Sequence, residues 1–251
     1  MPRDLPIPLI FAHRGFSSIA PENTLAAFQK AVEIDADGIE LDVQLSADGE
    51  IMVIHDTKLE RTTNGIGKVS NHPLSSLKAL DAGSWFSNEY KDVSIPTLGE
   101  VFSLIPKEML INVELKSDPD QVKTLPEKVV SLIKENKNQQ QILISSFNHE
   151  MLREIQKHLS GIMIGLLAQP SLLGFKTRNI SSKQIQHDAL HPYFRDVNSG
   201  LIKRYNNKGR RIHTYTVNKE EQMRKLFKMG VHGIFTDHPD RAIEVRVEVK
   251  A

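Results

Sequence analysis

The chain has 251 residues, with 32 basic and 31 acidic side chains, a formal net charge of +1 and a pI near 8.0. This balance gives no bulk electrostatic reason to expect binding to nucleic acid or to an anionic membrane, so any affinity for phosphate must be local. The absence of cysteine excludes disulfides, thiolate metal sites and a cysteine nucleophile.

The N-terminal stretch is apolar, but Pro6 and Pro8 interrupt it, and it is far shorter than the roughly 18 residues of a membrane-spanning helix. No small-residue processing site separates it from His13. We therefore expect a cytoplasmic protein without membrane insertion.

Short β-type runs alternate with segments of helical period, which is the pattern of βα units that build a parallel sheet. After the first strand, Asn23 or Thr24 can cap a helix in which Leu25, Phe28 and Val32 recur at helical spacing. The alternation and the chain length predict an α/β fold, a (β/α)8 TIM-type barrel that spans residues 1–251 as a single domain. The predicted strands are 9–14, 38–45, 51–55, 110–116, 142–147, 162–168, 188–191, 212–217 and 233–236.

The alternation breaks between the second and third strands, where residues 46–50 form a loop too short for a helix and suited to a hairpin. Two interpretations stay open: one strand there runs antiparallel, or the barrel lacks a helix. Residues 57–95 hold turn signals and one short helical stretch, Leu74–Leu80. We interpret this segment as a small insertion after the third strand, over the mouth of the barrel, because long βα loops form lids in such folds.

Helix ends are marked by local signals in the second half of the chain. Thr97–Glu100 has the spacing of a capping box, and Asn218 followed by Glu221 is a looser version of the same device. Gly209 and Gly230 are placed to end helical segments, because glycine adopts positive φ at little cost. These signals predict the last two βα junctions.

Apolar residues occupy alternate positions in the predicted strands 38–45 and 110–116. The polar residues between them therefore share the opposite face, which points inward in a barrel covered by helices. Burial of the three carboxylates of Glu40, Asp42 and Glu114 on this inward face would be very costly without a divalent cation to neutralise them. An all-oxygen ligand set favours Mg²⁺, Ca²⁺ or Mn²⁺ over Zn²⁺. The alternative is that Glu40 and Asp42 face the surface and pair with lysines. The inward-facing polar residues are Glu40, Asp42 and Gln44 in the first strand, and Asn112, Glu114 and Lys116 in the second.

Two histidines, His13 and His55, each end an apolar strand, and barrel active sites are assembled at the C-terminal ends of strands. Imidazoles exchange protons near neutral pH, so this pair can serve as general base and general acid. Arg14 can hold a phosphodiester anion, as can Lys116, although either can instead pair with an internal carboxylate.

Phe147 and Tyr215 are candidates to line a substrate pocket. The alternative is simple packing, which is the usual role of aromatic residues at strand ends.

The residues carry a resemblance to a known family. Nine segments that span nearly the whole chain match, in the same order, the motifs of the glycerophosphodiester phosphodiesterases, which the chain therefore resembles. They are His13–Gly15, Ala20–Thr24, Glu40–Val43, His55–Asp56, Arg61–Gly65, Asp81–Phe86, Ile95–Leu98, Val113–Lys116 and Gly233–Asp237.

The resemblance implies a (β/α)8 barrel with a small insertion after the second histidine, His55. It implies one divalent cation on Glu40, Asp42 and Glu114, with His13 and His55 as the catalytic pair, and it implies that Arg14 and Lys116 contact the phosphate. One position departs from the pattern, since many relatives carry tryptophan where this chain has Tyr215. The departure concerns substrate preference and not the chemistry.

The expected reaction is metal-dependent hydrolysis of a small-molecule glycerophosphodiester to sn-glycerol 3-phosphate and an alcohol. One alternative is an enzyme that acts at a lipid surface, of the phosphatidylinositol-specific phospholipase C or lysophospholipase D type. The lack of an obvious amphipathic basic helix or exposed aromatic cluster argues against it. A second alternative is a barrel that binds a phosphorylated ligand without turnover, against which the retained histidines and carboxylates argue. The preferred alcohol, the native metal and the oligomeric state stay open.

Overall fold

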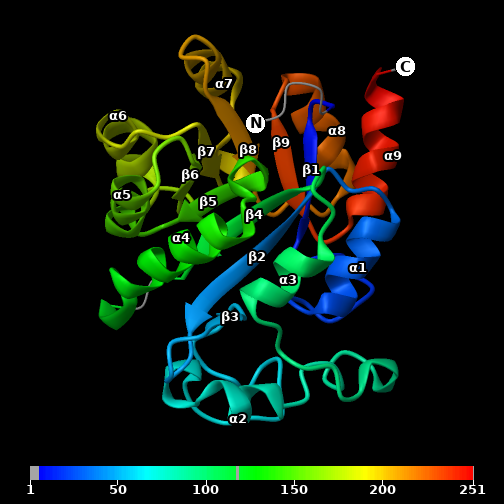
Figure 1. The fold of residues 1–251 in the computed structure, drawn as a ribbon. Helices are drawn as coiled ribbons and strands as arrows, with labels where there is room; N and C mark the ends of the chain where they lie inside the picture. Colours follow the sequence, from blue (N-terminus) through cyan, green and yellow to red (C-terminus); the bar gives the residue numbers. More distant parts are fainter. Residues whose placement is uncertain (1–5, 117–118, 251) are drawn as a thin grey trace.

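A closed barrel of eight parallel strands forms the centre of the computed structural model, which describes residues 6–116 and 119–250 (Figure 1). Around the barrel the strands follow the order β1, β2, β4, β5, β6, β7, β8 and β9, and β1 pairs with both β2 and β9 to close the ring. The expected (β/α)8 fold is confirmed. The barrel strands are β1 Leu9–His13, β2 Gly38–Leu45, β4 Leu110–Leu115, β5 Ile142–Ser146, β6 Met163–Ala168, β7 Ala189–Pro192, β8 Arg211–Thr214 and β9 Gly233–Thr236.

All nine predicted strands are present, and the largest difference lies at the end of β8. The sequence predicts a strand to residue 217, but β8 ends at Thr214. Beyond this point the backbone N–H of Tyr215 donates to the carbonyl of Pro192, and that of Val217 donates to the carbonyl of Phe235. The chain thus leaves the ladder while it still bonds to the barrel rim.

Helices cover the outside of the barrel (Figure 1). Thr24, and not Asn23, caps the first helix, and its side chain accepts a hydrogen bond from the N–H of Ala27. The expected capping box at Thr97 and Glu100 has both of its hydrogen bonds. The helices are α1 Leu25–Glu33, α2 Leu74–Lys78, α3 Leu98–Leu104, α4 Thr124–Asn136, α5 His149–His158, α6 Ser182–Gln184, α7 Ser199–Asn206, α8 Glu220–Met229 and α9 Pro239–Lys250.

The expected cap at Asn218 is wrong. Lys219 precedes α8 without a side-chain cap. The amide of Asn218 instead donates to Asp237 at 2.6 Å. At the other end of α8, Gly230 adopts φ 83° as expected for a terminating glycine.

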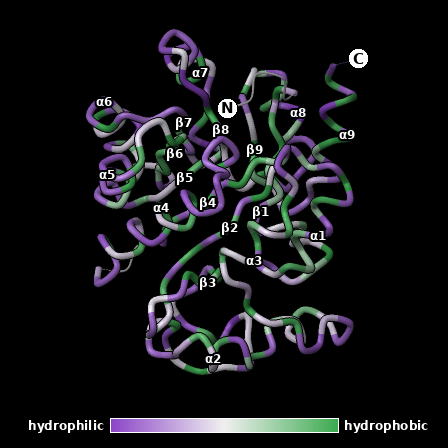
Figure 2. The backbone as a smooth tube through the Cα atoms, viewed as in Figure 1, coloured by the Kyte–Doolittle hydropathy of each residue, from purple (hydrophilic) through white to green (hydrophobic). Residues whose placement is uncertain are grey.

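The strand alternation separates two apolar regions. Outward residues such as Ile39 and Leu41 join the large core between barrel and helices. Leu9, Phe11 and Phe235 belong to a smaller cluster that fills the barrel interior. Figure 2 shows the same division as hydrophobic colour along the strands and hydrophilic colour on the outer helices and loops. The inward face of β2 is therefore left to its polar residues, as predicted.

The structure confirms the antiparallel interpretation of the hairpin at residues 46–50. β3 (Ile51–Val53) pairs antiparallel with β2 and lies outside the ring. The following segment, which contains α2, lies to one side of the barrel in Figure 1 and packs around a small apolar cluster that includes Leu59, Val69 and Leu77. Its role as an insertion over the barrel mouth stays a prediction.

Within the described residues, no helix combines the length and the apolar character needed to cross a membrane.

Candidate active site

The turn after β1 places the first candidate residues at the barrel mouth. Arg14 and Gly15 have φ values of 57° and 83°, so the chain reverses in two left-handed residues directly after His13. A Cβ on Gly15 would lie 2.6 Å from the backbone carbon of Ala27. Glycine is therefore required here both by conformation and by the close approach of α1.

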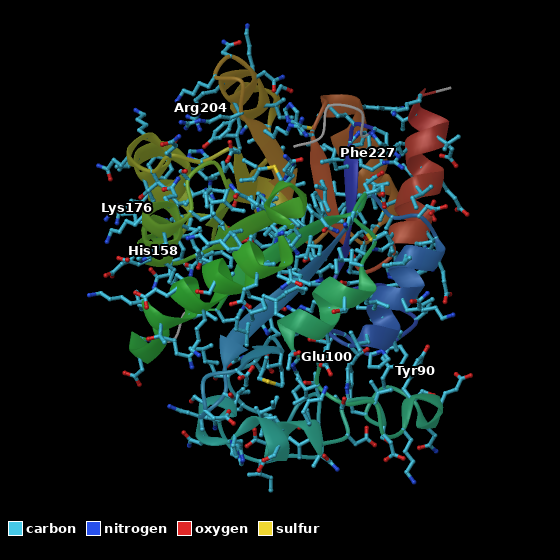
Figure 3. The ribbon with its side chains drawn as sticks, viewed as in Figure 1. Tyr90, Glu100, His158, Lys176, Arg204 and Phe227 are labelled. Carbon is cyan, nitrogen blue, oxygen red and sulfur yellow. The ribbon has the colours of Figure 1, made fainter. Side chains whose placement is uncertain are left out.

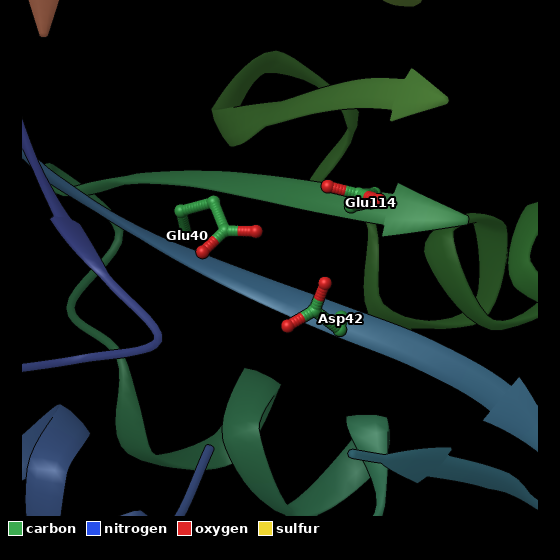
Figure 4. A group of neighbouring side chains, drawn as sticks. All are labelled: Glu40, Asp42 and Glu114. Carbon is green, nitrogen blue, oxygen red and sulfur yellow. The ribbon is translucent and has the colours of Figure 1, made fainter. Parts of the chain in front are cut away.

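Three predicted carboxylates come together on two neighbouring strands (Figure 4). Glu40 and Asp42 lie two positions apart on β2, and Asp42 is in register with Glu114 on β4. One oxygen of each residue lies within 4.8 Å of the others. The alternative of surface-facing carboxylates is excluded for β2, because Glu40 and Asp42 are 4% and 1% exposed.

Two cations neutralise only part of this charge. Lys116 Nζ lies 2.9 Å from Glu114 and 3.4 Å from Asp42, and Arg14 Nε lies 3.3 Å from Asp42. Although burial opposes it, Lys116 and Arg14 hold the pKa of Asp42 well below its ordinary value. Burial and the charge of Asp42 raise the pKa of Glu40 to about 8. An additional positive charge would relieve this repulsion, so the oxygen donors fit a hard divalent cation.

Each candidate histidine is held by an aspartate. His13 Nδ1 donates to Asp237 at 2.6 Å, and His55 Nδ1 donates to Asp56 at 2.6 Å. Burial lowers the pKa of His13, but the hydrogen bond to Asp237 and the charge of Glu40 outweigh it and leave the pKa raised. A carboxylate on Nδ1 selects the tautomer and leaves Nε2 for chemistry.

One cavity of about 260 Å³ joins these groups. Asp42 is buried and is not among the residues that line this cavity. The rings of Phe147 and Tyr215 meet edge to face at 6.1 Å, and the Tyr215 hydroxyl donates to the carbonyl of Ala168. Among the predicted site residues, the cavity is lined by His13, Arg14, Glu40, His55, Glu114, Lys116, Phe147 and Tyr215.

Four residues around the cavity, for which the sequence predicted no role in the site, hold its side chains in place. Asn23, with φ 57°, donates from its amide to Asp42 at 2.9 Å. Glu22 accepts from both Arg14 and Arg61, at 2.7 Å each. Asp237 completes this set. All four lie inside matched motifs, which is the one signal that could have found them, since their partners are distant in the chain.

Proton carriers that share a cavity with fixed positive charge suit the cleavage of a phosphate ester between two alcohols. The class that this barrel and its site fit is that of the TIM-barrel phosphodiesterases.

Comparison with known proteins identifies the family. The sequence model of the glycerophosphoryl diester phosphodiesterase family matches residues 13–241 of this chain. A glycerophosphodiester phosphodiesterase of Caldanaerobacter subterraneus subsp. tengcongensis is 41% identical over 238 residues, which cover 94% of this chain and 97% of the relative. One from Bacillus altitudinis is 38% identical, with coverage of 96% and 99%. The chain belongs to this family and is a phosphodiesterase enzyme.

A solved structure supports the fold assignment. The structure of an Oleispira antarctica phosphodiesterase in complex with the product sn-glycerol-3-phosphate matches with a TM-score of 0.86 at 32% identity. The match covers 95% of this chain and 96% of the other.

Proposed function

We propose that this enzyme hydrolyses small glycerophosphodiesters to sn-glycerol 3-phosphate and an alcohol, in a metal-dependent reaction with His13 and His55 as the acid/base pair. The observation that carries the proposal is the convergence of Glu40, Asp42 and Glu114 within 4.8 Å beside both histidines. The named product of the Oleispira antarctica relative supports the substrate class.

Two positively charged side chains at the cavity, Arg14 and Lys116, bind the substrate. Both line the cavity and hold a phosphodiester anion by charge-assisted hydrogen bonds. The ring pair Phe147 and Tyr215 forms an apolar wall against which the glycerol or alcohol carbons pack.

The imidazoles of His13 and His55 transfer the protons. Asp237 and Asp56 keep the proton on Nδ1 of His13 and His55, so each ring works through Nε2. One histidine removes a proton from the attacking oxygen while the other protonates the leaving alcohol, and either assignment is compatible with the proposal. The attacker is water or the 2-hydroxyl of the substrate glycerol, which would gain from its high effective concentration.

Glu40, Asp42 and Glu114 are the residues that would hold one divalent cation, Mg²⁺, Ca²⁺ or Mn²⁺. When bound, such a cation supplies charge stabilisation for the oxygens of the transition state.

The test measures release of glycerol 3-phosphate from glycerophosphocholine by the purified enzyme. We expect a chelator to abolish release and added divalent metal to restore it. His13→Ala and His55→Ala should each lower kcat by at least ~10²-fold. His72→Ala is the matched control, because His72 lies outside the cavity and bonds to the carbonyl of Ile66.

Near-full activity in both cavity variants would overturn the catalytic assignment. Tight binding of the substrate without release of product would favour the binding-only alternative. Faster turnover of a lysophospholipid in micelles than of glycerophosphocholine would move the substrate class to lipids.

A further inference from the structure

The loop after β6 exposes an unusual concentration of apolar surface. In residues 169–181, Leu172, Leu173 and Phe175 are 87%, 78% and 56% exposed. A single exposed leucine is ordinary on a protein surface. Three large apolar side chains exposed within four residues make an apolar patch of this loop, and such patches mark interaction sites.

The polar groups of this loop are engaged in holding its shape. Arg178 donates to the carbonyls of Gln169 and Ser171, at 3.0 and 2.6 Å, and to Asp196 at 2.9 Å. The N–H of Ser171 also donates to Asp196, at 2.8 Å. Gly174 is packed so closely on Gln169 that a Cβ would collide with its carbonyl oxygen. The loop is therefore pinned to the barrel while its apolar side chains point outward.

The part of the chain that carries the patch is rich in positive charge. Residues 169–204 carry a net charge of +4, against +1 for the whole chain. Lys176 and Arg204 lie on the side of the barrel that α5, α6 and α7 form (Figure 3). The charged residues in this range are Lys176, Arg178, Lys183, Arg195, Lys203 and Arg204, with Asp188 and Asp196.

A groove of about 480 Å³ continues the basic surface from the loop to α7. Phe175 lines it on the loop side, and Arg178, Arg195 and Arg204 also line it. Asp196 is the carboxylate of the groove, and Arg178 already pairs with it. Among the described residues that line the groove, basic side chains thus outnumber acidic ones, which suits phosphate groups.

We propose that this loop docks the enzyme onto an anionic phospholipid surface, with Leu172, Leu173 and Phe175 entering the headgroup region. Exposed apolar side chains flanked by lysine and arginine are the combination that binds such surfaces. A second copy of this chain is a poor occupant, because the same face would bring like charges together. The loop begins beside the catalytic cavity, because Ala168, the last residue of β6, accepts the hydroxyl of Tyr215, which lines that cavity.

The experiment is co-sedimentation with phospholipid vesicles, and it is independent of the proposed reaction. The wild-type protein should partition onto vesicles of equal parts phosphatidylcholine and phosphatidylglycerol, and far less onto phosphatidylcholine alone. The double variant Leu172→Ser with Leu173→Ser should lower the partition coefficient at least tenfold. Replacing Lys176 and Lys183 by glutamine should lower it about fivefold for each lost charge at low salt, and less at high salt.

Val247→Ser is the matched control, because Val247 is 65% exposed on α9, far along the chain from the loop. It should leave partition unchanged, and thermal unfolding should show that every variant is folded. Absence of binding by the wild-type protein at low salt would overturn the proposal and point to a protein partner. An equal loss in Val247→Ser, or equal binding to both vesicle types, would also overturn it.

Discussion

Asp237 accepts a hydrogen bond from Nδ1 of His13 at 2.6 Å, although 224 positions separate the two residues in the chain. Burial alone would raise the pKa of Asp237, but the hydrogen bonds from His13, Asn218 and Ser17 lower it to about 2. The carboxylate is therefore ionised and can only accept. It holds the proton of His13 on Nδ1 and keeps Nε2 unprotonated in the neutral ring.

Replacing Asp237 by asparagine should inactivate the enzyme without unfolding it. The new amide can donate to Nδ1, which would move the ring proton to Nε2 and remove the basic nitrogen from the cavity. We expect kcat to fall by about 10²- to 10⁴-fold, by analogy with the same change in a serine-protease triad. Steady-state kinetics with a soluble glycerophosphodiester measures kcat for the variant and for wild type. Unchanged kcat would show that Asp237 does not position His13.

Lys116→Met should affect metal and substrate in opposite directions. Lys116 neutralises Glu114 and Asp42, so its removal leaves more negative charge for a cation to bind. We expect about tenfold tighter Mn²⁺ binding by calorimetry, and kcat/KM about 10- to 100-fold lower because the phosphate loses a charged donor.

The matched control is Lys157→Met, since Lys157 pairs with Glu154 on the outer surface. It should change neither quantity. Weaker metal binding in Lys116→Met would mean that the lysine organises the carboxylates and does not compete with the cation.

His213 should make the fold sensitive to acid. Its ring is fully buried between Phe11 and Phe235, and neither ring nitrogen has a hydrogen-bond partner among the described residues. Burial holds its pKa well below the ordinary value, so it stays neutral in the folded state and protonates only on unfolding. Its contribution to the free energy of unfolding is complete above pH ~6.5 and is lost as the pH falls below that value.

The variant His213→Phe isolates this effect. The difference in free energy of unfolding, variant minus wild type, should increase by about 1.4 kcal/mol for each pH unit below 6.5. Above pH 6.5 this difference should be constant. Urea unfolding at several pH values measures the difference. A difference that is independent of pH would refute the assignment of a neutral buried ring.

Gly15 should tolerate no side chain, in contrast to another glycine of positive φ. Gly15→Ala would place a Cβ 2.6 Å from the backbone of Ala27, so we expect a loss of about 3 kcal/mol or more in the free energy of unfolding. Gly209 has φ 64° and nothing within 4 Å of its Cβ position. Gly209→Ala should cost only about 1 kcal/mol. Similar losses for both variants, measured by urea unfolding, would contradict this argument.

The strand pattern and the inward carboxylates could be predicted because both depend on local periodicity. Alternation in 38–45 assigns Glu40 and Asp42 to one face whatever the rest of the chain does. The parallel register that sets Glu114 beside Asp42 then follows from neighbouring strands of one barrel. The capping box at Thr97 was also predictable, because its two hydrogen bonds span three residues.

Other features had no local signal. Asn23 was a plausible helix cap, but Thr24 takes that role, while Asn23 contacts Asp42 across the barrel wall. Asn218 was a plausible cap too, but it bonds to Asp237. In both cases a short polar side chain had a local partner and a distant one available, and the distant carboxylate bound it.

The sequence by itself determined the element order, the inward faces of β2 and β4 and the identity of the chemical groups at the strand ends, since these follow from spacing along the chain. Only the tertiary structure decided which aspartate holds His13 and that Leu172 and Leu173 face solvent. Closure of the barrel brings β9 beside β1, and solvent exposure depends on what packs above a residue. Both are relations between distant segments, which no local pattern encodes.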